Sequence, residues 1–184
     1  MTVNHGMGAP STSILMHELL KLLHYAEATN VKFLRMGTCG GLGVKPGTLI
    51  LTKSGFDGCL EKGIEIVALG QKKRYQADAD PKFLTELTET LSEMKVPYEI
   101  GNTMTCNDFY ETQGRLDGAF CEYSNDDKMS FIQKAHDEVS FWSFEFRQGS
   151  KDRLELVQLI LIVTSFLVWY QKHRNGSIFI LGNV

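Results

Sequence analysis

Residues 31–41 read Val-Lys-Phe-Leu-Arg-Met-Gly-Thr-Cys-Gly-Gly, an apolar run that passes directly into a glycine-rich segment. The pattern predicts a buried strand at 31–34 that ends in a loop. In such a loop, glycines let backbone N–H groups approach an anion, and the fork of Arg35 can hold two phosphate oxygens. A lone arginine at a strand end usually pairs with a surface carboxylate. The adjoining glycines and the hydroxyl of Thr38 favour phosphate binding instead.

Predicted helices and strands alternate along the chain. Apolar residues at helical spacing predict a helix at 13–26, which Ser11 or Ser13 would cap. A second helix is expected to begin at Pro81, and Asp126 and Asp127 are expected to cap a third. Strands are predicted at 1–4, 48–52, near 65–67 and at 96–100. This alternation indicates an α/β fold, a layered mixed β-sheet with flanking helices.

Length and charge narrow the class of protein. The chain has 184 residues, which suits one compact domain, and a formal net charge of −3. That charge provides no basic surface for a polyanion, so we expect no nucleic-acid partner. The four cysteines lack C-x-x-C spacing, the five histidines are scattered, and the first residues lack a signal-peptide pattern. We therefore expect a cytoplasmic protein with reduced thiols and no metal site.

Residues 101–118, Gly-Asn-Thr-Met-Thr-Cys-Asn-Asp-Phe-Tyr-Glu-Thr-Gln-Gly-Arg-Leu-Asp-Gly, hold a second candidate site. Gln113 and Arg115 are two residues apart, so an extended backbone would point both toward one pocket. A carboxamide and a guanidinium together match the O2/N3/O4 edge of a pyrimidine, and Phe109 offers a face for the base or sugar. The alternative interpretations are a polar turn for the pair and a core position for Phe109.

Three segments in order, 5–13, 35–41 and 101–118, resemble animal-type uridine phosphorylases of the nucleoside phosphorylase superfamily. The resemblance runs from about residue 3 to residue 138. It implies a nucleoside phosphorylase-like fold and the phosphorolysis of uridine to uracil and ribose 1-phosphate, with inorganic phosphate as co-substrate and no cofactor. It also implies a homodimer and a reaction in which no protein residue is assigned as nucleophile or general base. Phosphate would bind to Arg35 and Thr38, and substrate to Gly40, Phe109, Gln113 and Arg115.

The chain departs from the family pattern at both ends. A glycine-rich loop with a phosphate-binding arginine, a sugar-contacting histidine and an arginine donated across the dimer would lie upstream of His5, so the chain is expected to be truncated. His5 itself is expected to hydrogen-bond to backbone. Downstream, the residue that aligns with a ribose-binding carboxylate is Arg147, while Glu145 is a remnant acidic position at most. We therefore predict a partial phosphorylase-like domain at 1–138 and a divergent tail at 139–184.

The tail contains an apolar stretch at 156–170. Its 15 residues are short of the roughly 20 that a membrane-spanning helix needs. A buried helix or strand is favoured over a membrane segment or poorly folded sequence.

Three functions compete for this sequence. The first is an enzyme of pyrimidine nucleoside salvage and catabolism. The second is an inactive form that keeps part of a nucleobase and phosphate pocket and acts by binding or interaction. The third is purine nucleoside phosphorolysis, which the pair of Gln113 and Arg115 argues against, because purine sites usually present an acidic group to the ring.

Overall fold

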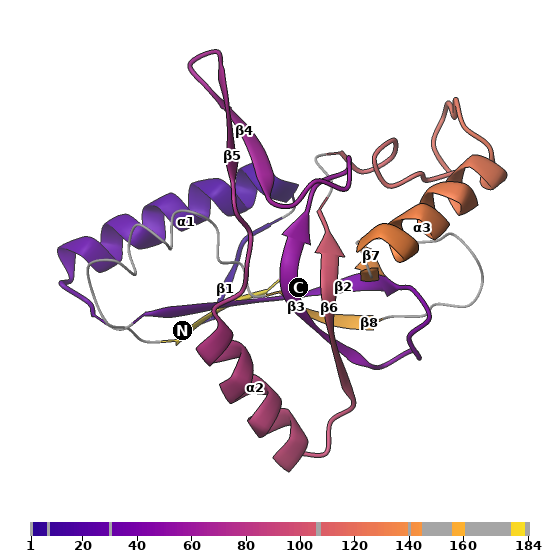
Figure 1. The fold of residues 1–184 in the computed structure, drawn as a ribbon. Helices are drawn as coiled ribbons and strands as arrows, with labels where there is room; N and C mark the ends of the chain where they lie inside the picture. The colour runs from indigo at the N-terminus through magenta and orange to yellow at the C-terminus, as the bar shows by residue number, and fades with distance from the viewer. Residues whose placement is uncertain are drawn as a thin grey trace.

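The computed structural model describes residues 2–6, 8–29, 31–105, 108–139, 141–144, 156–160 and 178–182. Within them, the main sheet has seven strands, in the order β1-β9-β2-β7-β6-β3-β8, and a separate hairpin pairs β4 with β5 (Figure 1). The predicted α/β fold with a mixed sheet and flanking helices is confirmed. The elements are β1 (Thr2–Asn4), α1 (Gly8–Tyr25), β2 (Lys32–Gly41), β3 (Leu49–Phe56), β4 (Ile64–Ala68), β5 (Gln71–Tyr75), α2 (Pro81–Glu93), β6 (Tyr98–Met104), α3 (Asn125–Val139), β7 (Phe141–Phe144), β8 (Leu156–Ile160) and β9 (Ile178–Gly182).

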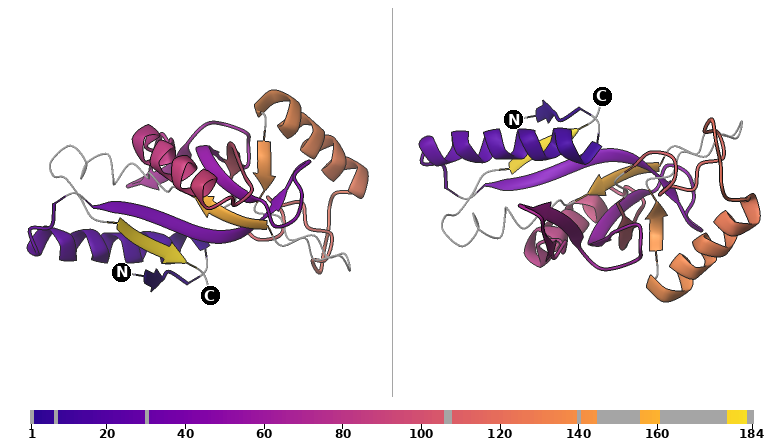
Figure 2. Two further views of the ribbon diagram at one scale, coloured as in Figure 1. Left: turned by 90° about the horizontal axis from the view of Figure 1, so that it is seen from below. Right: turned by 90° about the horizontal axis from the view of Figure 1, so that it is seen from above.

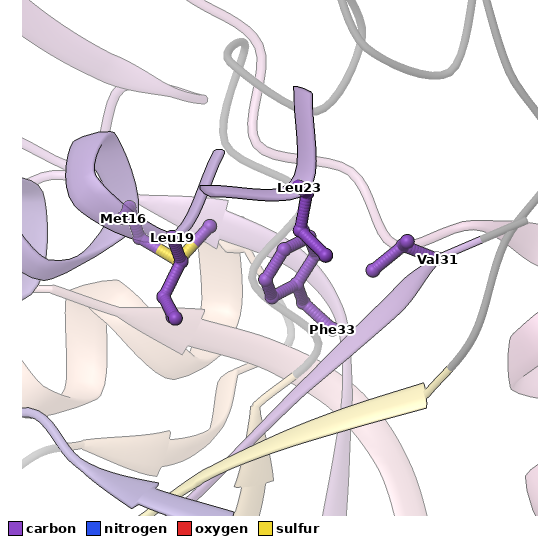
Figure 3. Packing of buried hydrophobic residues seen from close by; sticks show 5 residues of the cluster. All are labelled: Met16, Leu19, Leu23, Val31 and Phe33. Atoms are coloured by element: carbon purple, nitrogen blue, oxygen red, sulfur yellow. The ribbon is translucent and has the colours of Figure 1, made fainter. Parts of the chain in front are cut away.

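Helices α1 and α2 cover opposite sides of β2 (Figure 2). Side chains of a strand alternate between its two faces, so one strand can serve both helices. Val31 and Phe33 pack against α1, where buried residues form one cluster (Figure 3). Leu34 packs on the other side with Phe83 of α2. The alternation along β2 therefore builds two cores, one on each face of the sheet. The α1 cluster consists of Met16, Leu19, Leu23, Val31 and Phe33.

Strand pairings close into a ring at the centre of the fold. β2 pairs antiparallel with β7 and β8, while β3 runs parallel to β6 and β8, and β6 runs parallel to β7. Strand β2 is thereby linked to itself through β7, β6, β3 and β8. Ile50 and Leu51 of β3 are fully buried inside this arrangement.

Two predicted boundaries are wrong, each for its own reason. Helix α1 begins at Gly8 and not at residue 13, so Ser11 and Ser13 lie inside it. Pro10 falls in the first turn, where its missing N–H has no helical partner to lose. The glycine-rich segment 35–41 is strand and not loop, because β8 pairs with Arg35–Cys39 and β7 pairs with Gly40 and Gly41. Local composition did not reveal these distant partners.

Caps define the starts of the other two helices. The carboxylate of Asp80 accepts the backbone N–H of Phe83 at 2.8 Å, so α2 begins at Pro81 as predicted. At α3 the cap is Ser124, not the predicted pair of aspartates. The N–H of Asp127 donates to Ser124 Oγ at 3.2 Å, and the N–H of Ser124 donates to Asp127 Oδ2 at 2.8 Å. This reciprocal pair is a capping box.

Segments on both sides of residue 138 belong to one sheet. Strands β7, β8 and β9 all lie beyond that residue and pair with β2. The division into 1–138 and 139–184 stays a prediction. Of the apolar stretch 156–170, residues 156–160 form β8 and the rest lie outside the described residues, as do Glu145 and Arg147. Among the helices described, none has the length and apolar character needed to cross a membrane.

Candidate functional site

The ends of β2 and β6 meet across β7. Gly40 of β2 and Met104 of β6 are both registered with Phe144. Neighbouring strands lie about 4.8 Å apart, so the two ends are separated by roughly 10 Å. Leu42, just beyond β2, also packs in the same cluster as Met104 and Ala135 of α3. The sheet therefore brings the predicted phosphate segment toward the predicted base-binding segment.

Arg35 is held from the side by a histidine. Its Nε donates to His5 Nε2 at 3.1 Å, and both side chains are buried. Because Nε2 accepts, the ring proton belongs on Nδ1, which lies 3.1 Å from Thr12 Oγ1. The Thr12 hydroxyl in turn donates to the carbonyl of Gly8 at 3.1 Å. The helix start thus orients the guanidinium through His5, a side-chain link that sequence spacing did not indicate.

The predicted phosphate-binding loop is a strand in the structure. Thr38 is exposed, while Gly40 is half-buried and registered with Phe144. At Gly37, a Cβ atom would lie 3.4 Å from Arg35 Nη1, so the guanidinium rests against this glycine. Strand β9 pairs with residues up to Met36, and β7 with residues from Gly40. The assignments of Arg35, Thr38 and Gly40 as ligand residues stay predictions.

Residues 108–115 form one capped helical turn, which corrects the extended backbone expected for this segment. Oδ1 of Asp108 accepts the N–H groups of Tyr110 and Glu111 at 2.7 and 2.8 Å, and Oδ2 accepts the N–H and hydroxyl of Thr112. The turn ends with Gly114 at φ 58°, where the next N–H reaches back to Tyr110 O at 2.9 Å. That closure is a Schellman motif, for which glycine is the favoured residue.

This turn buries Gln113 and Arg115, the two predicted base ligands. Gln113 is 6% exposed and Arg115 is 7% exposed. Gln113 Nε2 lies 3.4 Å from the carbonyl of Asp108, which leaves Oε1 as an acceptor. Within the described residues, Gln113 Oε1 and Arg115 Nη1 are buried without a hydrogen-bond partner. One turn therefore carries an unused acceptor and an unused donor.

Phe109 and Asp117 flank the guanidinium of Arg115. Its Cζ lies 4.3 Å from the centroid of the Phe109 ring, so one face of that ring is already occupied. Phe109 remains 45% exposed, which leaves ring surface open to solvent. Asp117 accepts from Arg115 Nε at 3.0 Å and from Nη2 at 2.5 Å. Phe109 was among the predicted site residues and Asp117 was not. A carboxylate two residues after an arginine is nevertheless a recognisable signal for an ion pair.

Hydrogen bonds and neighbouring charges shift several pKa values around the turn. Hydrogen bonding from Thr112 holds the pKa of Asp108 well below its usual range. The hydrogen bond from Arg115 lowers the pKa of Asp117. Burial and the neighbouring Arg115 lower the pKa of Lys128, while Asp117 opposes that change. In the described part of the chain, no three His, Cys, Asp or Glu side chains gather as a metal site would require.

Comparison with known proteins places these features in a family. The family model of the phosphorylase superfamily matches residues 1–139 of the chain. The chain belongs to the phosphorylase superfamily. This phosphorylase-superfamily chain is 45% identical over 137 residues to uridine phosphorylase A of Schistosoma mansoni, a match covering 73% of the chain and 46% of that protein.

Further relatives confirm the predicted relationship with uridine phosphorylases. The inactive uridine phosphorylase B of the same organism is also 45% identical over 137 residues, covering 73% of this chain and 46% of the relative. The crystal structure of uridine phosphorylase from Schistosoma mansoni in complex with uracil superposes with a TM-score of 0.72 at 36% identity. That match covers 86% of this chain and 57% of the solved one. The chain thus spans about half the length of the curated relatives it matches.

Proposed function

We propose that this chain carries the base and phosphate sites of a uridine phosphorylase, which converts uridine and phosphate into uracil and ribose 1-phosphate. The observation that supports this most is that Gln113 Oε1, an acceptor, and Arg115 Nη1, a donor, have no hydrogen-bond partner among the residues that the structure describes. Uracil offers the complementary groups, an N3–H donor and carbonyl acceptors on either side of it. A buried polar group without a partner costs about 1–3 kcal/mol, a cost that such a ligand removes.

In the proposed reaction, a phosphate oxygen attacks the anomeric carbon of uridine while the glycosidic bond breaks. The bonding electrons leave with N1 of uracil, and their negative charge spreads to the ring oxygens. Arg115 Nη1 then faces a more negative oxygen than in the ground state, so its hydrogen bond strengthens toward the transition state. Removing one donor of this kind typically costs about 2.7–4 kcal/mol in activation free energy.

Phosphate binding at Arg35 and Thr38, with a substrate contact at Gly40, belongs to the same proposal. The buried hydrogen bond between Arg35 and His5 supports it, because it fixes a cation beside Gly37 in the glycine-rich part of β2. Inorganic phosphate acts as co-substrate, without a further cofactor, in a cytoplasmic homodimer. Light scattering on the purified chain tests the dimer directly.

A second candidate is an inactive form that binds the base without turning it over. The observation in its favour is that this chain is equally similar to uridine phosphorylase A and to the inactive uridine phosphorylase B of one organism. Sequence identity therefore does not separate the two functions.

Phosphate-dependent release of uracil from uridine tests both candidates. Turnover by the purified chain that is lost in Arg115→Ala and Arg35→Ala supports the enzyme, with Lys21→Ala as a control at an exposed position. Uracil binding by calorimetry without turnover supports the inactive form. A folded chain that neither binds uracil nor releases it overturns both.

A further inference from the structure

The guanidinium of Arg115 has its donors divided between two directions. Nε and Nη2 both donate to the carboxylate of Asp117, at 3.0 and 2.5 Å. Nη1 is the nitrogen that has no partner among the described residues. The Phe109 ring lies against the guanidinium plane, with Cζ 4.3 Å from its centroid. Rotation of Arg115 therefore breaks two charge-assisted hydrogen bonds and one stacking contact.

The pairing of Arg115 with Asp117 determines which ligands the remaining nitrogen favours. A free guanidinium carries a full positive charge and several donors, so it favours carboxylate and phosphate. A guanidinium already paired with a carboxylate has its charge largely balanced. A neutral carbonyl, as in a lactam, then becomes the better partner for the remaining nitrogen.

We propose that Asp117 is a positioning residue: it engages Nε and Nη2 of Arg115 and so presents Nη1 to the carbonyl of a neutral pyrimidine. The inference rests on the proposed function, because it assumes that Arg115 contacts the base. Asp117 does not touch the ligand in this arrangement. It acts through Arg115 alone.

The surroundings of Asp117 fit this role. Its side chain is 50% exposed, whereas that of Arg115 is 8% exposed, so the carboxylate closes the solvent side of a buried cation. The hydroxyl of Tyr123 donates to the carbonyl of Arg115 at 2.7 Å, which fixes the backbone from a third direction. Lys128, buried nearby in α3, is a second cation that Asp117 helps to balance. Loss of Asp117 therefore removes the carboxylate that pairs with Arg115 and that partly offsets the charge of Lys128.

Two ligands separate positioning from a general structural role. Uracil is neutral at pH 7, whereas barbiturate presents the same N–H and C=O edge but carries a negative charge. Calorimetry would measure both ligands with the full chain, with Asp117→Asn and Asp117→Ala, and with Glu122→Gln as an exposed control in the same segment. Circular dichroism and thermal unfolding would establish that each variant is folded.

We expect Asp117→Asn to weaken uracil binding about tenfold and Asp117→Ala more, in line with the loss of charge-assisted hydrogen bonds. Barbiturate is expected to lose less affinity or to gain, so the ratio of the two dissociation constants shifts at least about tenfold in its favour. Glu122→Gln is expected to leave both unchanged.

The outcomes are distinguishable. If the unmodified chain binds neither ligand, the proposed function fails, and this inference fails with it. If the unmodified chain binds uracil and both Asp117 variants bind it equally well, Asp117 is not a positioning residue while the proposed function stands. Equal losses for uracil and barbiturate in folded variants would also overturn the inference, because a structural role predicts no change in the ratio.

Discussion

Replacing Asp108 with alanine removes the acceptor on which the base-binding turn is built. The carboxylate accepts three backbone N–H groups, at 2.7, 2.8 and 2.6 Å, and the hydroxyl of Thr112. Loss of a helix N-cap costs about 0.5–2 kcal/mol. Tyr110 and Glu111 are exposed, so water replaces the acceptor for their N–H groups, whereas Thr112 is half-buried. We therefore expect the upper end of that range, about 2 kcal/mol, and a fall in Tm of roughly 4–8 °C.

The same substitution has a pH signature with a definite sign. Hydrogen bonding from Thr112 depresses the pKa of Asp108 in the folded state. A depressed folded pKa contributes stability that is fully present above the unfolded value of about 3.9 and is lost as the pH falls through the folded pKa. The difference in unfolding free energy between the unmodified chain and Asp108→Ala is therefore expected to be constant from pH 7 to about 5, and to shrink below about 4.

Urea unfolding at several pH values measures this difference. Asp108→Asn keeps one acceptor without the charge. Its free energy of unfolding is therefore expected to lie between those of the unmodified chain and Asp108→Ala, without the pH dependence. Glu122→Ala, an exposed carboxylate of the same segment, serves as the control. A difference that stays constant down to pH 3 in a still-folded protein would refute the assigned role of the Asp108 carboxylate.

Other parts of the fold give further tests. His5→Ala removes a hydrogen bond to the buried Arg35 Nε, so we expect a loss of about 1–3 kcal/mol in urea unfolding and a higher KM for phosphate, whereas an unchanged KM would contradict the role of His5 in orienting Arg35. Phe83→Ala removes the buried side chain with which α2 packs on the sheet and should lower the free energy of unfolding by about 3–5 kcal/mol in the same assay. A loss below about 1 kcal/mol would show that the helix does not rely on this contact. Gly63→Ala should lower the Tm sharply, because the glycine has φ 95° and a Cβ there would lie 2.2 Å from the carbonyl oxygen of Tyr75.

Sequence reasoning recovered the elements that local patterns determine. The strand at the N-terminus, the helix starting at Pro81 and the layered α/β class follow from short-range signals such as proline and apolar spacing. Asp80 shows why this works, since its cap joins residues three positions apart. Gln113 and Arg115 share one turn, but their role as base ligands stays a prediction.

Features that depend on distant partners were missed. The segment after Leu34 looks like a loop from its glycines, yet it is strand because β8, more than 100 residues later, pairs with it. The hydrogen bond between His5 and Arg35 joins residues 30 positions apart, and no spacing rule indicates it.

One local signal was also overlooked. Gly114 has a left-handed backbone and ends a capped turn where an extended segment was expected, although glycine is the residue that favours such a turn.

A strand after residue 138, β7, lies between the two strands that lead to the candidate ligand sites. Arg35 lies on β2 and Arg115 follows β6, and the described contact between these strands runs through β7, which comes after residue 138. The register that places Gly40 and Met104 opposite Phe144 is therefore set by β7. Attack of phosphate on the anomeric carbon requires the phosphate and the base-bound nucleoside to be held in a precise relative position. An error of about 1 Å can cost about a hundredfold in rate. We therefore expect turnover to depend on the register of β7 as well as on the predicted ligand residues.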